Sequence, residues 1–390
     1  MAKIAANKKL MTLKSYLEMN KMIDNNHLPK YLALKKKIEN LINQGKVEPD
    51  NKLPTENELA KRYGVSRHTV RKALNLLEQE GLLYKKQGVG TFYSENSKKP
   101  TKNIGFISIS LYDYIFVDIL NGADNVLHRN GYQILLGNSQ DNQAREREIL
   151  ESFLKKNVDG LILDPAKGAY NYPNLGLLER FVEKQIPVVI LDTRFENERF
   201  NYVTVDDVQG GYLATDYLIR NGHRNIGIIY KAMHKPAINR FQGYKKALED
   251  NNIPVLNDFV KQYYISEFEN PEEFEEEVAH LTRELMQSRE KPTAIFCFND
   301  QIAILVKEIL SDLNYRVPQD ISLIGYDDSK LVKLQNISIT SIAHPKKKAG
   351  EKAARIILEK IQEKNNQFNE DVVFEPRLIK RGSVSSLIKS

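Results

Sequence analysis

Basic and hydrogen-bonding side chains cluster in a short stretch near the beginning of the sequence. An arginine can bond the edge of a guanine base through two parallel contacts, or it can bind a phosphate group. Serine, threonine and histidine can add hydrogen bonds to bases or phosphates. The side chains concerned are Ser66, Arg67, His68, Thr69 and Arg71. Their chemistry favours recognition of double-stranded DNA, and the alternative is a helix face that is merely basic and solvated.

Two short helices joined by a tight turn must present these side chains. Gly64 is suited to ending the first helix, and Ser66 can cap the second. The apolar positions are Leu59, Ala60 and Tyr63 in the first helix and Val70, Ala73, Leu74 and Leu77 in the second. This pattern predicts a helix-turn-helix, whose second helix presents its first residues to the major groove.

Further elements on both sides complete a winged unit. A β-hairpin is predicted from Leu83 to Tyr93, with its turn at Gln87-Gly-Val-Gly90. Before the helix pair, residues 28–43 form an amphipathic helix, and Lys30 at its beginning could contact phosphate. We therefore expect an α+β winged helix-turn-helix domain over residues 28–94, preceded by an extension over 1–27 that is expected to be disordered.

Residues 29–93 resemble the winged-helix DNA-binding domain of the GntR family of bacterial repressors. The motifs that carry the resemblance are Leu53-Pro-Thr-Glu56, Val65-Ser-Arg-His-Thr-Val-Arg71, Glu80-Gly-Leu82 and Gly88-Val-Gly-Thr-Phe92. The resemblance implies DNA contacts at Glu56 or Asn57, at Arg67, His68, Thr69 and Arg71, and at Gln87 and Gly88 in the wing. Asn57 stands where many relatives have arginine.

Charge is distributed unevenly along the 390 residues. Residues 1–102 hold 21 lysines and arginines against 10 acidic residues, and the remainder holds 36 against 41. A basic head on an acidic body is typical of a nucleic-acid-binding module joined to another domain. The single cysteine, Cys297, lies in an apolar run and excludes a disulfide framework. No secretory signal and no membrane-spanning stretch is recognisable, so we expect a cytoplasmic, nucleoid-associated protein.

Residues 95–102 have the composition of a linker, and beyond them short apolar strands alternate with helices. Such alternation predicts parallel sheets covered by helices on both faces. Two successive runs of this kind, the second beginning with a strand at Tyr202–Val205, suggest two Rossmann-like lobes with a cleft between them. We expect residues 103–390 to form this α/β domain, which would bind an effector and dimerise.

Polar side chains follow many of these strands, at the sheet edge where ligands bind in such folds. Carboxylates, an amide, an arginine and tyrosine rings suit a polyol, because each hydroxyl both donates and accepts while the ring C–H face packs on aromatics. The strand ends are Ser110–Tyr114, Asp164–Lys167, Asp192–Arg194, Lys231, Asn299–Asp300 and Asp327–Asp328, with Arg240 in a following helix. An aspartate after a strand is usually a cap or turn former. We expect structural roles for Asp300 and Asp328.

Residues 103–383 resemble the effector-binding domain of the LacI family. Among the shared motifs are Pro187-Val-Val-Ile-Leu-Asp192, Phe298-Asn-Asp300 and Ile321-Ser-Leu-Ile-Gly-Tyr-Asp-Asp328. The resemblance implies a sugar site lined by Asp192, Arg240, Asn299 and Asp327, with Tyr114, Lys167 and Lys231 as further candidates. Arg240 would donate to two hydroxyls at once, and the aspartates would accept hydrogen bonds from hydroxyls. Asn299 would both donate and accept.

A GntR-type head on a LacI-type body resembles the arabinose-responsive repressors of Gram-positive bacteria. That resemblance implies a homodimer that binds palindromic operator DNA and is released by L-arabinose, with no cofactor and no metal. A repressor responding to another sugar such as ribose or xylose, or a sugar-binding transport component, remains open. An enzyme is disfavoured, because the sequence shows no phosphate-binding glycine loop, metal-ligand cluster or nucleophile–base signature.

Overall fold

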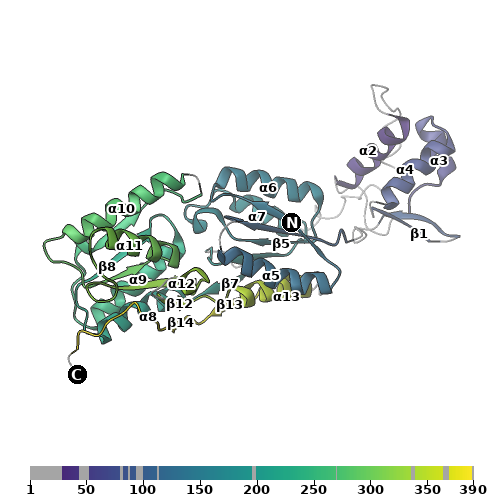
Figure 1. Ribbon diagram of the computed structural model, residues 1–390. Coiled ribbons are helices and arrows are strands. Elements are labelled where there is room, and N and C mark those ends of the chain that lie inside the picture. Colours follow the sequence, from purple (N-terminus) through teal and green to yellow (C-terminus); the bar gives the residue numbers. More distant parts are fainter. Residues whose placement is uncertain are drawn as a thin grey trace, which may run out of the picture. The chain divides into compact units, whose positions relative to one another are not determined.

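The computed structural model describes residues 29–43, 52–79, 82–86, 88–93, 100–111, 114–195, 199–268, 270–334, 339–362 and 369–388. The chain divides into two compact units, Met1–Thr101 and Lys102–Ser390 (Figure 1). The predicted extension over 1–27 lies outside the described residues, as does Gln87.

The first unit contains the predicted winged helix-turn-helix. Its elements are α2 (Lys30–Asn43), α3 (Glu56–Tyr63), α4 (Arg67–Gln79), β1 (Leu83–Lys86) and β2 (Gly90–Tyr93). Thr55 caps α3: its hydroxyl accepts from the Glu58 amide at 3.3 Å, and the Glu58 carboxylate accepts from the Thr55 amide at 2.8 Å. Gly64 ends α3 with a left-handed φ of 63°. The inner faces of all three helices meet in one apolar core with Leu53, Leu83 and Tyr93.

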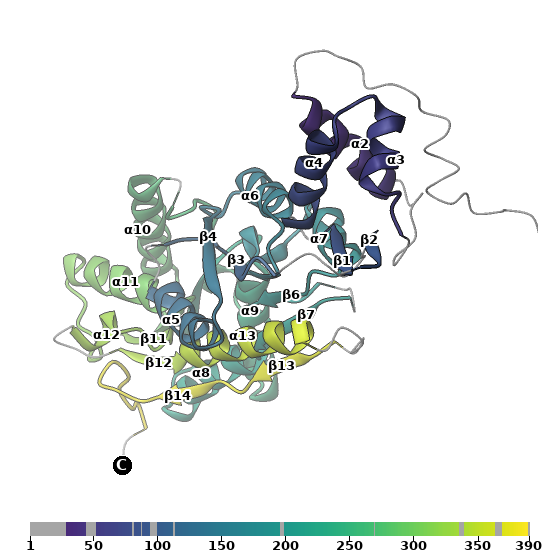
Figure 2. The same cartoon turned by 90° about the vertical axis from the view of Figure 1, so that its right-hand side faces the viewer.

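The second unit contains two lobes, and the N-terminal lobe is built on a six-stranded, fully parallel sheet. Its strands, in the order β13-β7-β6-β5-β3-β4, are β13 (Asp371–Phe374), β7 (Asn201–Val205), β6 (Val188–Leu191), β5 (Gly160–Leu163), β3 (Asn103–Ser108) and β4 (Gln133–Asn138). Helices α5 (Tyr114–Arg129) and α13 (Lys346–Gln362) cover one face (Figure 2). Helices α6 (Gln143–Lys156) and α7 (Leu175–Glu183) cover the other.

Alternation along the strands explains this double coverage. Ile162 and Val189 belong to the apolar cluster under α5 and α13, whereas Leu161 and Val188 belong to the cluster under α6 and α7. Successive strand side chains point to opposite faces, so a continuous apolar run supplies both layers.

The C-terminal lobe has a second six-stranded sheet in the order β14-β12-β11-β10-β8-β9, in which only β14 is antiparallel. The strands are β14 (Arg377–Ile379), β12 (Thr340–Ala343), β11 (Ser322–Asp327), β10 (Ala294–Cys297), β8 (Ile226–Lys231) and β9 (Val260–Tyr263). Its helices are α8 (Asp207–Arg220), α9 (Lys235–Asp250), α10 (Pro271–Gln287), α11 (Asp300–Asp312) and the short α12 (Leu331–Leu334). Two 3-10 turns, η1 (Ala166–Ala169) in the N-terminal lobe and η2 (Asn257–Phe259) in this one, complete the described elements. Cys297 is fully buried in β10, and burial raises the pKa of its thiol.

The lobes are not successive segments, and the sequence prediction was wrong on this point. β7 pairs with β6 and β13 in the N-terminal lobe instead of beginning the second one. Within the described residues the chain passes between the lobes three times: between β7 and α8, between β12 and α13, and between β13 and β14. An apolar run indicates a strand but not its neighbours, so sheet membership was not readable from the local pattern.

Each lobe contains a pair of helices whose backbones touch through glycines. A Cβ on Gly211 of α8 would lie 2.0 Å from the carbonyl oxygen of Arg240 in α9. In the other lobe, a Cβ on Gly350 of α13 would lie 1.9 Å from the carbonyl oxygen of Ile119 in α5. Side chains larger than hydrogen are excluded at these positions unless the helices separate.

Candidate DNA interface and interlobe effector site

Ser66 and Thr69 begin the predicted recognition helix by capping it. The Thr69 amide donates to the Ser66 hydroxyl at 3.1 Å, and the two hydroxyl oxygens are 2.8 Å apart. Both hydroxyls therefore serve the helix start while they remain near its exposed face. Arg67 and His68, in the same turn, are exposed, and the Arg67 side chain retains 61% of its accessible surface.

Glu56 at the beginning of α3 lies close to the two arginines of α4. Arg71 donates from Nε and Nη2 to the Glu56 carboxylate, with a shortest contact of 2.9 Å, and Arg67 Nη2 lies 3.8 Å away. The bond from Arg71 lowers the pKa of Glu56. This carboxylate hydrogen-bonds the Arg71 guanidinium and lies within 4 Å of that of Arg67, so both arginines are on one surface.

The other predicted DNA contacts lie on separate elements. Lys30 is the exposed first residue of α2, and Asn57 is exposed in the first turn of α3. Gly88 lies in the exposed hairpin turn with a left-handed φ of 74°. The contacts described above link Glu56 with Arg67 and Arg71, and Ser66 with Thr69. The same unit contains Lys30, Asn57 and Gly88, which take no part in these contacts.

In the second unit, Arg240 lies at the centre of a buried polar network. Its Nε donates to Asp207 at 2.8 Å, its Nη1 donates to the carbonyl oxygen of Phe298 at 2.7 Å, and its Nη2 is 3.8 Å from Asp327. Its guanidinium carbon lies 3.5 Å from the centre of the Tyr326 ring. Burial acts to lower the pKa of Arg240, but the carboxylates, Asp207 first, outweigh it and raise that pKa. A guanidinium has five donors, so the predicted bonds to two hydroxyls would use those left over.

Asp192 follows strand β6 and Asp327 is the last residue of β11, and both have left-handed backbones, with φ values of 56° and 95°. Asp192 Oδ1 is 2.9 Å from His344 Nε2, which follows β12. Burial acts to raise the pKa of Asp192, but His344 and Arg240 outweigh burial, and the net effect is a lowered pKa. The carboxylate therefore stays charged. Asp327 is fully buried, and its backbone oxygen accepts from the Lys346 ammonium.

Lys231 connects the two lobes. Its ammonium is 3.0 Å from Asp141, which follows β4 of the N-terminal lobe, and 3.2 Å from Glu267, which lies between β9 and α10. Asp141 also accepts from the backbone amide of Lys167 at 2.5 Å. Burial acts to lower the pKa of Lys231, but Glu267 and Asp141 outweigh it and raise that pKa.

The structure thus brings Asp192, Lys231, Arg240 and Asp327 together where the lobes meet, and we call this region the interlobe site. His234 lies beside them: its ring centre is 5.6 Å from that of Phe298, and the Arg240 guanidinium carbon is 4.7 Å from the same Phe298 ring.

Asn299 adjoins the interlobe site and caps α11 by accepting from the Ile302 amide at 2.9 Å. Lys167 contributes its backbone, and its side chain is exposed. Tyr114 begins α5, and its side chain lies outside the described part of the chain.

Two strand-end aspartates have the structural roles expected of them. Asp300 accepts from the Ser329 amide at 2.6 Å and from the Ser341 hydroxyl at 2.7 Å, while Asp328 is paired with Arg381. Burial, and then the charge of Asp327, raises the pKa of Asp300 to about 7. These groups join strands β11 and β12 to the helices behind them.

Sequence reasoning missed five members of the interlobe site. These are Asp141, Asp207, His234, Glu267 and His344, which all bond to, or lie among, the predicted residues. Asp141 and His344 follow strand ends whose polar residues we did not single out, so the strand-end rule could have found both. Asp207 and Glu267 lie at a helix start and in a loop, where carboxylates are common for other reasons.

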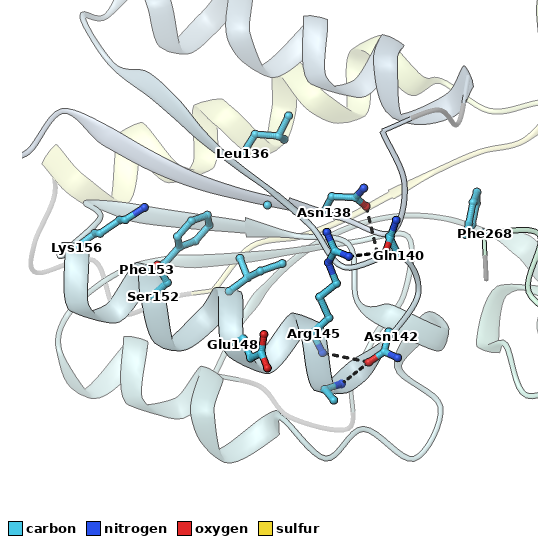
Figure 3. A pocket seen from close by; sticks show the side chains of 13 residues that line it. Leu136, Asn138, Gln140, Asn142, Arg145, Glu148, Ser152, Phe153, Lys156 and Phe268 are labelled. Carbon is cyan, nitrogen blue, oxygen red and sulfur yellow. Dashed lines mark hydrogen bonds between the residues drawn. The ribbon is translucent and has the colours of Figure 1, made fainter.

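A pocket of about 960 Å³ lies beside edge strand β4 and helix α6 (Figure 3). It borders the interlobe site, because its lining includes Gln140, which precedes Asp141, and Phe268, whose ring centre is 5.8 Å from the Lys231 ammonium. Polar groups in its lining are bonded to one another: the Arg145 guanidinium donates to the Gln140 side chain, and the Asn142 side chain accepts from the backbone amide of Arg145 at 3.1 Å. None of the seven predicted effector residues lines it.

No helix in the described part of the chain is long and apolar enough to cross a membrane. No group of three or more histidines, cysteines or carboxylates there is arranged to hold a metal ion.

Comparison with known families gives one match in each of the two units. Residues 30–92 match the family described as bacterial regulatory proteins, gntR family, and residues 215–384 match the periplasmic binding protein-like domain.

Close relatives span both parts. The chain is 37% identical to an arabinose metabolism transcriptional repressor of Geobacillus stearothermophilus, over 92% of this chain and 99% of that protein. It is 34% identical to a repressor of the same description from Halalkalibacterium halodurans, over 91% and 96% of the two chains. A solved LacI family transcriptional regulator from Enterococcus faecium with bound ribose is 25% identical, with a TM-score of 0.63, over 73% of this chain and 100% of that one.

Proposed function

The chain belongs to the family of arabinose metabolism transcriptional repressors, and from that premise we propose that it represses genes of arabinose uptake and catabolism until L-arabinose binds. It is accordingly a transcriptional regulator and not an enzyme. In this proposal the protein is a homodimer, its effector is L-arabinose and its DNA target is a palindromic operator. The protein would lie on the chromosome in the cytoplasm.

The DNA part of the proposal is supported by the ordered surface around Glu56. Arg67 and Arg71 are exposed beside Glu56 and near His68 in the first turns of α4, and Arg71 is hydrogen-bonded to Glu56. A dimer would place two such helices about 34–36 Å apart on a palindromic operator, one helical turn along the same side of the duplex.

The single observation that carries the effector part is the polar network across the lobe boundary. Lys231 of one lobe bonds Asp141 of the other, and Asp192 bonds His344. A sugar that binds among these groups exchanges protein contacts for its own hydroxyls and so changes the preferred arrangement of the lobes. Release of DNA then requires the sugar to bind the released arrangement more tightly than the DNA-bound one.

The test begins with a duplex that the purified full-length protein selects from a random-sequence pool. We expect a palindromic consensus, and saturating L-arabinose should weaken its binding at least about tenfold, equivalent to about 1.4 kcal/mol of coupling. Fluorescence anisotropy of the labelled duplex measures the affinity. Operator affinity that does not change at saturating L-arabinose would refute the proposal.

Two variants separate the two activities. Arg67→Ala should lose operator affinity and keep sugar binding, because Arg67 is an exposed side chain of the first unit. Asp192→Asn should lose sugar affinity and keep operator binding without a response to the sugar. Calorimetric titration with L-arabinose and anisotropy with the duplex distinguish these outcomes.

A second candidate effector is ribose. The LacI family regulator from Enterococcus faecium, whose structure contains ribose, is similar over 73% of this chain. One hydroxyl contact in a buried polar site can change the preferred sugar strongly. The same titration with D-ribose decides the point, since tighter binding of ribose than of L-arabinose would keep the regulator and change its inducer.

A further inference from the structure

Both buried cations of the interlobe site are bound by two carboxylates each. Lys231 is held by Asp141 at 3.0 Å and by Glu267 at 3.2 Å. The Arg240 guanidinium contacts Asp207 at 2.8 Å and Asp327 at 3.8 Å. Both cations are more than nine-tenths buried, so these pairs lie where charge interactions are weakly screened.

This pairing gives the site an excess of negative charge. Lys231 and Arg240 face four carboxylates, and neither is available as an uncompensated anchor for an anion. Asp192 adds a fifth carboxylate, and the one further buried ammonium among the described residues, that of Lys346, bonds the backbone oxygen of Asp327. A phosphate ester carries close to two negative charges at neutral pH. Such a group entering beside Lys231 would meet Asp141 and Glu267 at short range, and like charges repel strongly in a partly desolvated site.

The remaining polar groups of the site suit hydroxyls. His344 is 7% exposed. Its Nδ1 has no hydrogen-bond partner among the described residues, and Nδ1 of His234 has none there either. Burial, and then the charge of Lys231, lowers the pKa of His234 to about 3, which keeps its imidazole neutral. A neutral imidazole nitrogen is a donor or an acceptor according to its tautomer, and a hydroxyl complements either one.

We propose that the interlobe site accepts uncharged sugars and rejects their phosphate esters, and that Asp141 and Glu267 enforce this selection by neutralising Lys231. The inference rests on the proposed function, because it assumes that the sugar binds in the interlobe site. Beyond that function, ligand selection would depend on the charge of the ligand (the charge rule), and Asp141 and Glu267 would be the residues that determine it. The repressor would thereby respond to the sugar before phosphorylation and not to the product of a sugar kinase.

Glu267 is the better residue for a test. Its side chain is 11% exposed and bonds Lys231 within its own lobe, whereas Asp141 is 3% exposed and also binds the Lys167 amide. Glu267→Gln removes one charge, keeps the shape and leaves Lys231 paired with Asp141. Glu267→Asp is the matched control, since it keeps the charge.

The experiment uses calorimetric titration of the full-length protein at pH 7.5 with three ligands. These are L-arabinose, its methyl pyranoside and L-arabinose 1-phosphate; the last two are substituted on the same carbon, with a neutral methyl group in one and a larger phosphate carrying close to two negative charges in the other. For the wild type we expect the phosphate to bind at least about 100-fold more weakly than the methyl pyranoside. Glu267→Gln should reduce that ratio about tenfold, and Glu267→Asp should keep it.

Each outcome decides something. A wild-type ratio near one, with the neutral sugar bound, would overturn the charge rule and leave the proposed function intact. A large wild-type ratio that Glu267→Gln leaves unchanged would overturn the assignment to Glu267. If none of the three ligands binds, the proposed function and this inference fail together. Should Glu267→Gln not fold, the wild-type ratio still decides the charge rule, and Asp141→Asn tests the assignment.

Discussion

Removal of the Arg240 side chain should destabilise the effector unit strongly. Arg240→Ala would leave Asp207, 5% exposed, and Asp327, fully buried, without their shared cation. Removing one partner of a buried ion pair costs about 3–5 kcal/mol, because the other charge stays buried and uncompensated. Loss of the guanidinium from the face of Tyr326, 3.5 Å away, adds about 1 kcal/mol.

The cost should depend on pH in a defined direction. Burial already raises the pKa of Asp207 in spite of Arg240, and the substitution raises it further. A carboxyl whose folded-state pKa exceeds its unfolded value favours folding at low pH and loses that contribution as pH rises through the folded pKa. The deficit of Arg240→Ala relative to the wild type should therefore be largest near pH 8 and shrink toward pH 5.

Thermal unfolding followed by circular dichroism measures the effect. A loss of 3–5 kcal/mol corresponds to a fall in Tm of about 6–15 °C for a unit of this size. The double variant Arg240→Ala/Asp207→Asn should recover part of the loss, because it removes one uncompensated charge. The reasoning would be refuted by a Tm of Arg240→Ala within about 1 °C of the wild type, or by a double variant no more stable than the single one.

The same calculation affects how binding data are interpreted. Loss of L-arabinose binding in Arg240→Ala could follow from rearrangement of Asp207 and Asp327 and need not show a direct contact. Arg240→Lys, which keeps a cation in place, is the informative variant for binding. It loses the planar fork that spans Asp207 and the Phe298 carbonyl, but it leaves neither carboxylate wholly without a positive neighbour.

Three further predictions concern other parts of the chain. Gly211→Ala should lower stability by more than about 2 kcal/mol in thermal unfolding, because its Cβ would lie 2.0 Å from the Arg240 carbonyl oxygen, whereas Gly176→Ala, with nothing within 4 Å, should raise it by up to about 1 kcal/mol. Asp300, with a pKa raised to about 7, should make wild-type stability fall as pH rises from about 4 to 7, and unfolding of Asp300→Asn at pH 5 and 8 should show a flatter profile. Arg71→Ala should weaken operator binding by about 1–3 kcal/mol in anisotropy titrations and leave calorimetric sugar binding unchanged.

Local sequence signals were sufficient for the first unit. Its signals act over a few residues each: they are the capping residues Thr55 and Ser66, the glycine that ends α3 and the hairpin turn. The sequence pattern therefore predicted the helices and strands of this unit and also their order. The same holds for most strands and helices of the second unit, where periodicity is strong.

Contacts between distant segments were not predictable in this way. Lys231 meets Asp141, 90 residues earlier, and Glu267, 36 residues later, only because strand ends of two sheets converge. Nothing in the spacing of these residues indicates the pairing. The assignment of β7 failed for the same reason, since hydrogen bonding to β6 and β13 is decided by the whole sheet and not by the strand.

The interleaving of the two lobes has a consequence for synthesis and for genetics. The winged unit is complete at Tyr93, so it can fold while most of the chain is still untranslated. The N-terminal lobe, in contrast, waits for α13 and β13, and the C-terminal lobe waits for β14 and for Ser383, whose carbonyl accepts from Leu323 at 2.8 Å. A stop codon after Ala343 would leave both lobes incomplete, although it removes only the last 47 of 390 codons. Late nonsense mutations should therefore abolish the sugar response as fully as early ones, while they spare the segment that reads DNA.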